Sequence, residues 1–272
     1  MADRNAAFVG SIPENYDRYL GPLFFHGYGD EMAARLPVGR GMRVLETACG
    51  TGIVTERLLA RLAGAGHLVA TDLNEPMLAY AATRIGPREG LKWRQADAMK
   101  LPFDDQSFDA VVCQFGLMFL PDKAAGAREA FRVLRPGGRL LVSVWDHLED
   151  NPAPRITHET VATYFPSDPP TFYAVPFSLH DPTVVHGLLD GAGFEDVQWQ
   201  RLDRVGVSPS AAHAVVGLIE GNPIYGAIME RRPSALAEIK AAVAKTLATT
   251  LGDNPLRAPL RAIFFAARRP EV

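Results

Sequence analysis

Two glycines follow an acid at the end of a short apolar run near the start of the chain. The run Met42–Leu45 ends in Glu46, Gly50 and Gly52 come next, and a helix-like stretch begins directly after them. Strand, tight turn and helix in this order are typical of the opening of a nucleotide-binding βαβ unit. Glycine suits a turn that lies close to a ligand, because a Cβ there would collide. We therefore expect backbone N–H groups of this turn to face a ligand.

Three later features strengthen this interpretation. Asp72 ends a second apolar run, His67–Thr71, and an acid about 20 or more residues past such glycines can hold both hydroxyls of a ribose. As a crevice residue, Asp72 is expected to be solvated. Asp97 follows a third short run, Leu91–Arg94. The segment Arg132–Trp145 then reads as a helix end, a Pro-Gly-Gly turn and a further strand.

With these motifs the chain resembles the class I S-adenosylmethionine (SAM)-dependent methyltransferases. It is most similar to the ubiquinone/menaquinone-methyltransferase-like group, also called methyltransferase type 11. The specific motifs cover residues 40–147, and a looser similarity continues to the C-terminus. The resemblance implies SAM as cofactor and S-adenosyl-L-homocysteine as product. The sequence departs from the family at Ala48, where glycine is usual; alanine is tolerated there only if its φ stays negative.

The resemblance implies a role for each candidate residue at the cofactor. Glu46 would bind the methionine amino group, directly or through water, although an acid at a helix N-terminus can also serve only the helix dipole. Asp72 would hold the ribose, and Asp97 would accept from the adenine amino group. The candidate cofactor residues are Tyr16, Glu46, Ala48, Gly50, Gly52, Asp72, Leu73, Met77, Asp97, Ala98, Gln114 and Phe115.

The remaining candidates line the adenine or the methyl group in the same scheme. Leu73 and Met77 would press on the adenine face, and the Ala98 N–H would reach a ring nitrogen. Gln114 and Phe115 follow the fourth predicted strand, beside the methyl group. Met77 and Phe115 could equally be ordinary core residues.

An aromatic-rich segment, Pro13–Phe25, precedes the first predicted strand. The resemblance implies that such a segment folds over the cofactor or the acceptor. Tyr16 or Tyr19 would then cover the charged end of the cofactor, because a sulfonium attracts the face of an aromatic ring. The alternative is that these aromatic residues only pack the segment onto the core.

Apolar runs and helical patterns alternate through the first half of the chain. Strands are expected at 42–46, 67–72, 91–95, 108–114 and 139–145, and helices at 53–63, 76–84 and 122–134. This α/β alternation predicts a parallel sheet with helices on both faces. The resemblance implies a Rossmann-like, seven-stranded, mostly parallel sheet with an antiparallel last strand. The polar stretch Leu101–Ser107 is expected to contribute a weak crossover helix.

The domain organisation follows from changes in this pattern. An N-terminal lid segment (1–40) precedes the SAM-binding Rossmann-like core (41–149), and residues 179–206 and 256–272 complete the core sheet. Two insertions, 150–178 and 207–255, are expected to form a helical cap over the acceptor side. Their aromatic residues could line an acceptor pocket, pack the cap onto the sheet or form a homodimer contact. These are Tyr164, Phe165, Phe172, Tyr173, Phe177 and Tyr225.

Composition limits the class of protein. The 272 residues are 47% hydrophobic and carry a net charge of −3 with no basic stripe, so no nucleic-acid partner is expected. Two cysteines, Cys49 and Cys113, form neither a disulfide framework nor a zinc motif, which suits a reducing, cytoplasmic location. The N-terminus lacks a signal-peptide pattern, and no apolar stretch is long enough to span a membrane.

The leading interpretation is methyl transfer from SAM to an O, N or C atom of a small-molecule acceptor with an apolar or aromatic part. Such a displacement depends mainly on proximity and alignment, although some nucleophiles also need a general base. His26, His147 and His180 are candidates, but each is more simply a surface histidine; no catalytic residue and no metal site is assigned.

Two other function classes remain open from the sequence. An NAD-dependent oxidoreductase shares the glycine turn and the ribose acid, but normally lacks an acid at the position of Glu46 and the Pro-Gly-Gly turn. A non-catalytic SAM-binding protein is also compatible, because methyl transfer requires few obligatory side chains.

Overall fold

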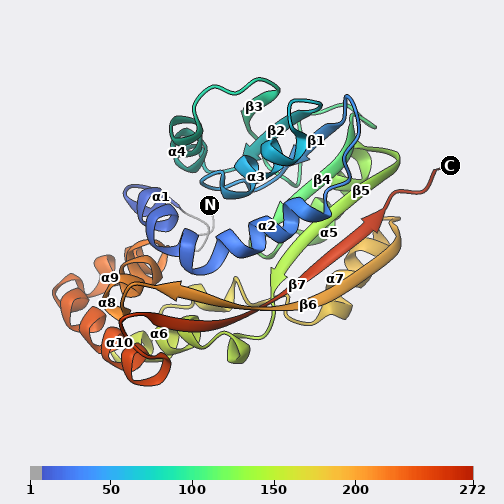
Figure 1. Cartoon of the computed structure of the whole chain (residues 1–272). Coiled ribbons are helices and arrows are strands. Elements are labelled where there is room, and N and C mark those ends of the chain that lie inside the picture. Colours follow the sequence, from blue (N-terminus) through green and yellow to red (C-terminus); the bar gives the residue numbers. More distant parts are fainter. Residues whose placement is uncertain (1–7, 272) are drawn as a thin grey trace.

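The computed structural model describes residues 8–271, which form one seven-stranded sheet with helices on both faces (Figure 1). The strand order is β3-β2-β1-β4-β5-β7-β6. The first five strands are parallel, and β7 runs antiparallel between β5 and β6. This confirms the predicted α/β, Rossmann-like sheet. The strands are β1 Arg43–Glu46, β2 His67–Asp72, β3 Leu91–Gln95, β4 Phe108–Gln114, β5 Leu134–Trp145, β6 Glu195–Ser208 and β7 Leu256–Arg268.

Side-chain caps mark the start of some of the helices that cover the sheet. Two of them start at aspartates whose side chains accept a backbone N–H of the first turn: Asp122 before α5 and Asp181 before α7. In pairs, α2 packs on α3 and α5 packs on α7. The bounds are α2 His26–Arg35, α3 Ile53–Leu62, α4 Glu75–Ile85, α5 Lys123–Val133 and α7 Pro182–Gly191.

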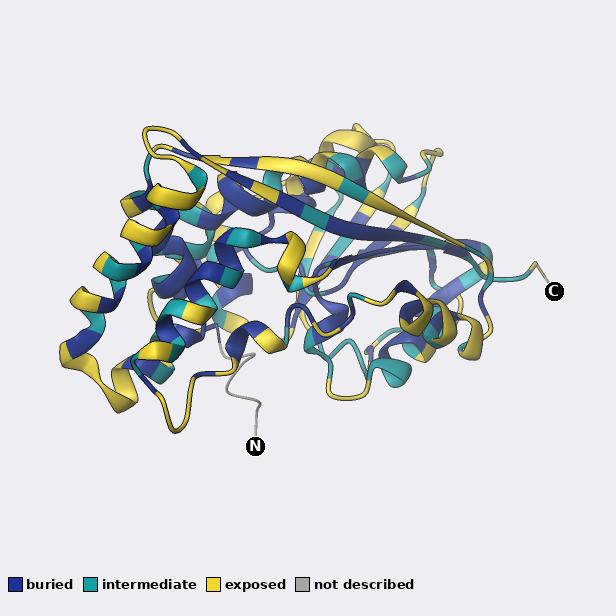
Figure 2. Ribbon diagram, turned by 90° about the horizontal axis from the view of Figure 1, so that it is seen from below, coloured by how far each residue is buried: buried dark blue, intermediate teal, exposed yellow. Residues whose placement is uncertain are grey.

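The second half of the chain gathers helices at one end of the sheet (Figure 1). There β6 and β7 form a long antiparallel pair, and α10 packs on α6 and α8 beside them. The outer strand β6 is exposed along most of its length, whereas β7 is largely buried (Figure 2). The bounds here are α6 Pro152–Thr163, α8 Ala211–Val215, α9 Ile224–Arg231 and α10 Leu236–Leu251.

The N-terminal aromatic segment is helical. Helix α1 (Ile12–Asn15) continues into a π-helical stretch, Tyr16–Phe25, which contains Pro22 and leads into α2. π-Helical geometry is rare and is frequently found at functional sites. A second π-helical stretch, Val216–Glu220, packs against the first. The N-terminal segment therefore contacts the helical half of the molecule as well as the sheet.

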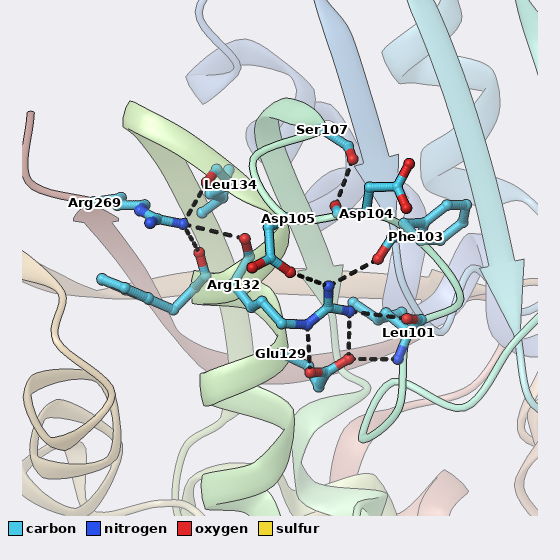
Figure 3. Close-up of polar contacts among 10 residues, drawn as sticks. Leu101, Phe103, Asp104, Asp105, Ser107, Glu129, Arg132, Leu134 and Arg269 are labelled. Carbon is cyan, nitrogen blue, oxygen red and sulfur yellow. Dashed lines mark hydrogen bonds and ion pairs between the residues drawn. The ribbon is translucent and has the colours of Figure 1, made fainter.

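The predicted crossover helix at Leu101–Ser107 is wrong, because this segment is a loop. Its backbone groups bond to side chains of α5 in place of helical partners (Figure 3). The Leu101 N–H donates to the Glu129 carboxylate at 2.6 Å. The Arg132 guanidinium donates to the Leu101 carbonyl at 2.9 Å and to the Phe103 carbonyl at 2.8 Å. These bonds stabilise an irregular backbone that would otherwise leave polar groups unpaired.

Candidate functional site

Ten of the twelve candidate cofactor residues line a single pocket at the carboxyl ends of β1, β2, β3 and β4. We call it the strand-end pocket. It contains about 780 Å³ of space including its open mouth. The structure brings together Tyr16, Ala48, Gly50, Asp72, Leu73, Met77, Asp97, Ala98, Gln114 and Phe115.

Asp72 organises the floor of the strand-end pocket. Its carboxylate accepts from the Gly50 N–H at 2.8 Å and, through its other oxygen, from the Asn74 N–H at 2.8 Å. Only 6% of the residue is exposed, so the expectation of a solvated acid is wrong. Burial raises the pKa of the Asp72 carboxyl, and the backbone hydrogen bonds oppose that rise. The acid therefore ties the glycine turn to the end of β2.

The turn after β1 adopts left-handed backbone at three positions. Ala48 has φ +52°, Gly50 +56° and Gly52 +82°. The condition that φ stays negative at Ala48 is thus not met, and the residue adopts a conformation that costs about 1–2 kcal/mol for a side chain with a Cβ. Its methyl group is accommodated because the facing residue is Gly116, where a Cβ would overlap it.

The two glycines of the turn have different structural roles. Gly50 lines the strand-end pocket, and a Cβ there would meet no described atom within 4 Å, so it would project into open space. Gly52 does not line the pocket. A Cβ at Gly52 would lie 2.7 Å from Ile85 and 3.2 Å from Ala81, so this glycine lets α4 pack against the start of α3.

Glu46 is the other candidate that the structure keeps away from the pocket wall. Its side chain is buried at the end of β1 and accepts from the Thr55 hydroxyl at 2.6 Å. Burial raises the pKa of Glu46 to about 8, and the bond from Thr55 opposes that rise. The carboxyl therefore changes protonation near neutral pH.

Tyr16 lines the strand-end pocket, and Tyr19 does not. Its ring stacks on Phe25 with centroids 4.7 Å apart and meets Phe8 edge-on at 5.9 Å. Burial and the nearby Asp72 carboxylate raise the pKa of the Tyr16 hydroxyl. Tyr19 lies elsewhere, against the ring of His213 at 4.6 Å. The π-helical turn decides which of the two tyrosines faces inward.

Gln114 and Phe115 shape the inner wall. Phe115 adopts φ +53° and stacks on Trp145 with centroids 4.1 Å apart and ring planes 5° apart. The Gln114 Oε1 atom is buried and has no hydrogen-bond partner among residues 8–271. Buried polar atoms normally have partners, so this oxygen is available to a donor on a ligand.

A second cavity, the aromatic pocket, adjoins the first. Phe8, Tyr16, Phe115 and Phe119 line both. Within the described chain, no acid, histidine, lysine, arginine or cysteine lines the aromatic pocket. Its remaining wall comes from the N-terminal segment, β5 and the cap. These residues are Leu20, Phe24, Phe25, Trp145, Pro154, Phe172, Tyr173, Pro176, Phe177 and Asn222.

Three of the six predicted cap aromatics lie in this wall: Phe172, Tyr173 and Phe177. Tyr164 instead points outward and bonds to Glu238 at 3.3 Å. Sequence reasoning missed Phe8, Phe24 and Phe119, although Phe119 follows β4 in an apolar run. Phe8 precedes the aromatic-rich segment Pro13–Phe25, and no periodic pattern marks it.

The candidate histidines lie outside both cavities. His147 and His180 face each other at 4.2 Å in an open, polar depression with three aspartates and two arginines. His26 is half-buried, and burial lowers its pKa. No group of three or more metal-binding side chains occurs in residues 8–271. Nor is any helix in that part of the chain long and apolar enough to cross a membrane.

Comparison with known proteins agrees with this geometry. The methyltransferase-domain family matches residues 45–142. The ubiquinone/menaquinone biosynthesis C-methyltransferase UbiE of Idiomarina loihiensis is 33% identical over 181 residues, which span 61% of this chain and 71% of that protein. UbiE of Escherichia coli K12 shows the same identity and coverage.

Solved structures share the fold at low identity. A methyltransferase structure from Bacillus halodurans superposes with a TM-score of 0.56 at 20% identity, covering 90% of this chain and 98% of that one. Phosphoethanolamine N-methyltransferase 2 of Haemonchus contortus, bound to S-adenosylhomocysteine, reaches 0.61 at 17%, covering 95% and 57%. By its UbiE relatives and its domain, the chain belongs to the class I SAM-dependent methyltransferases, in the ubiquinone/menaquinone-methyltransferase-like family.

Proposed function

We propose that this SAM-dependent methyltransferase acts on a small molecule whose reacting part is apolar and aromatic. The observation that carries the proposal is the aromatic pocket, which shares four wall residues with the strand-end pocket. An acceptor ring there would lie next to the cofactor. A wall of rings without charged groups favours an apolar or aromatic guest.

The residues of the strand-end pocket fit SAM. Gly50 leaves room that a Cβ would fill. The Asp72 carboxylate accepts a hydrogen bond from the Gly50 N–H, and the hydroxyls of a bound ribose would replace part of this bonding. We assign Asp97, Ala98, Leu73 and Met77 to the adenine end. They line the pocket on the side of β2 and β3.

Gln114, Phe115 and Tyr16 are assigned to the end of the pocket that carries the methyl group. The unpartnered Gln114 oxygen accepts from a ligand donor. Tyr16 separates the two cavities, and the N-terminal segment acts as a lid. In this arrangement Glu46 acts on the cofactor through the buried residues beneath the glycine turn. The ammonium group of the cofactor nearby would favour the charged form of the Glu46 carboxyl.

The bound cofactor supplies a methyl group already activated on a sulfonium. The protein's part is to align an acceptor atom with that group and to exclude water. Tyr16, Gln114 and Phe115 would hold the methyl-bearing end of the cofactor, and an acceptor in the aromatic pocket would face it. No carboxylate or imidazole of the described residues lines the aromatic pocket, and we assign no general base.

The test is turnover with a panel of acceptors and methyl-labelled SAM. The panel contains phenols, catechols, quinols and aromatic amines, each matched by a saturated analogue of similar size. Methylation of the aromatic members alone supports the proposal. Methylation of the saturated members alone would overturn it. Tight SAM binding without any turnover would point instead to a non-catalytic SAM-binding protein.

A further inference from the structure

The outermost strand, β6, leaves one edge of the sheet open. It stands last in the strand order, and within residues 8–271 only β7 pairs with it. From Gln198 to Ser208 that pairing is regular, and the strand is exposed along most of its length (Figure 2). Trp199 and Val205 are large apolar residues with exposed fractions of 42% and 58%. An open strand edge with apolar side chains is a template for pairing with another strand.

The backbone of β7 shows which groups of β6 face the open side. Arg261 lies on β7 opposite Asp203. Its N–H donates to Asn151 Oδ1 at 3.0 Å, and its carbonyl accepts from the Asp146 N–H at 3.1 Å. Both backbone groups of Arg261 therefore point toward the end of β5 and away from β6. Arg261 and Asp203 thus form a non-hydrogen-bonded pair, so the N–H and carbonyl of Asp203 point to the open side.

This orientation recurs at every second residue of the strand, because antiparallel ladders alternate between the two kinds of pair. Trp199, Arg201 and Val205 therefore also direct their backbone groups outward. Val205 lies opposite Pro259, which agrees, since proline has no N–H to donate to β6. Within the described chain, no hydrogen bond from another segment reaches the backbone groups of these residues. Their side chains also share one face of the sheet.

The side chains along this edge are complementary to themselves. If a second copy pairs antiparallel about a two-fold axis through Leu202, Arg201 of one copy faces Asp203 of the other. In the same register Trp199 faces Val205, and each pair occurs twice because of the symmetry. Opposite charges and aromatic–β-branched pairs both stabilise neighbouring strands.

The charges also distinguish this register from its neighbours. Moving the axis to residue 201 would set Arg201 against Arg201, and moving it to residue 203 would set Asp203 against Asp203. Within one copy the Arg201 Nε atom lies 2.7 Å from Asp146, and the Arg261 Nε atom donates to Asp203 at 2.7 Å. Neither charge is therefore unpaired before assembly. The exchange of charges across the axis sets the register, while the backbone ladder and the apolar pairs supply most of the affinity.

The other edge of the sheet lacks this property. Strand β3 carries Lys92 and Arg94 and no acid. Antiparallel pairing of β3 with itself would bring cations together without a compensating carboxylate, and charged side chains of this kind protect an edge strand. Of the two edges, only β6 is suited to a second copy of the chain.

We infer that two copies of this chain associate through β6, antiparallel about an axis at Leu202, so that one sheet runs through both copies. The same surface serves both partners, so the assembly closes at two. No residue of β6 lines the strand-end pocket or the aromatic pocket, and the inference is therefore independent of the proposed function.

The first experiment is sedimentation equilibrium of the full chain with two variants at one position. Val205→Pro removes an N–H that points to the open side, so the ladder with β7 keeps its hydrogen bonds. It should raise the dimer dissociation constant by at least about tenfold, the equivalent of 1.4 kcal/mol. Val205→Thr keeps the N–H and the branched shape, and it should dimerise like wild type. Melting temperatures and SAM binding verify that each variant is folded.

The second experiment tests the register by cross-linking. Leu202→Cys places two thiols across the axis in a non-hydrogen-bonded pair, with Cα atoms about 4.5 Å apart and within disulfide range. Gln200→Cys is the matched control on the same face, where the two thiols would be separated by four residues of strand, about 13 Å. Under mild oxidation only Leu202→Cys should give a covalent dimer on a non-reducing gel. The native Cys49 and Cys113 are buried and do not interfere.

Dimeric wild type, dissociation by Val205→Pro but not by Val205→Thr, and cross-linking at residue 202 alone support the inference. Wild type that stays monomeric up to its solubility limit overturns it. So does a dimer that Val205→Pro leaves intact, or equal cross-linking of the two cysteine variants. If Val205→Pro does not fold, the cysteine pair decides the question by itself.

Discussion

At the scale of single residues, the strand-end pocket depends on a few buried polar groups and on one unusual turn. Asp72 holds the glycine turn in place, and Glu46 is buried beneath it. Ala48 occupies a left-handed conformation opposite Gly116. Each of these features leads to a measurable consequence.

Replacing Asp72 should weaken SAM binding and also destabilise the protein without ligand. Asp72→Ala is expected to reduce the free energy of SAM binding by about 1–3 kcal/mol, the usual loss for a charged acceptor. The Gly50 and Asn74 N–H groups lose their acceptor too, so the free energy of unfolding should fall. Calorimetry and urea denaturation measure the two effects. Unchanged SAM affinity would show that the ribose is held elsewhere.

The raised pKa of Glu46 makes stability depend on pH. The folded protein holds this proton up to about pH 8, whereas the unfolded chain releases it near 4.5. Between these values the folded state binds more protons, so the group's contribution to stability falls as pH rises. Urea denaturation should show wild type losing stability relative to Glu46→Gln from about pH 5 to about pH 8. A constant difference would contradict this.

Ala48 and Gly116 should behave as a coupled pair. Ala48→Gly relieves the left-handed alanine and should stabilise the protein by about 1 kcal/mol. Gly116→Ala should destabilise it, because the two methyl groups would overlap. In the double variant the loss should be smaller than in Gly116→Ala alone, and the part that remains comes from the Cys113 Sγ atom, 2.9 Å from the new methyl group. Additive changes in unfolding free energy would show that the two sites do not interact.

At the scale of elements, α5 holds the loop 101–107, which follows Asp97 and Ala98 in the chain. Arg132 and Glu129 bond to its backbone, and Arg132 also pairs with Asp105 at 2.7 Å (Figure 3). At the end of the same helix, the Arg269 guanidinium donates to the carbonyls of Phe131, Arg132 and Leu134. This second arginine therefore satisfies carbonyls that the helix end leaves unpaired.

Loss of the hydrogen bonds from Arg132 should make the loop 101–107 less ordered and thereby weaken SAM binding. Arg132→Gln is expected to raise the KM for SAM several-fold with a small change in kcat, because Asp97 and Ala98 stand just before the held segment. Arg132→Lys, which keeps the charge but not the forked geometry, should recover only part of the affinity. Equal losses in kcat and kcat/KM, with KM unchanged, would contradict a role through binding.

At the scale of the whole molecule, the site lies where three parts of the chain meet. The sheet provides the strand-end pocket, while the N-terminal segment and the cap complete the aromatic pocket. Structural likeness alone does not set the reaction, since the [4+2]-cyclase SpnF superposes on 90% of this chain with a TM-score of 0.57 at 23% identity. Under the proposed function, the aromatic pocket selects the acceptor.

A substitution in the cap should therefore affect the acceptor and not the cofactor. Phe172→Leu is expected to raise the KM for the acceptor identified in the turnover panel, while the Kd for SAM stays unchanged. Phe172 lines the aromatic pocket but not the strand-end pocket. A parallel loss of SAM affinity would show that the cap acts on the cofactor site.

Local sequence determined the sheet and most of the strand-end pocket. Alternating strands and helices specify a parallel sheet, and residues that follow successive parallel strands meet at one edge. The type and spacing of Asp72 therefore place it at this edge. The positions of Ala48, Asp97 and Gln114 at the cofactor rested on the resemblance to the methyltransferase family as well.

Tertiary structure decided the features that depend on burial and on distant segments. The sign of φ at Ala48 follows from the space left by Gly116, far along the chain. The inward position of Tyr16, in place of Tyr19, follows from π-helical geometry and from stacking on Phe25. The aromatic pocket draws on residues between Phe8 and Asn222. No local pattern encodes such contacts, because each is set by how separately formed elements pack.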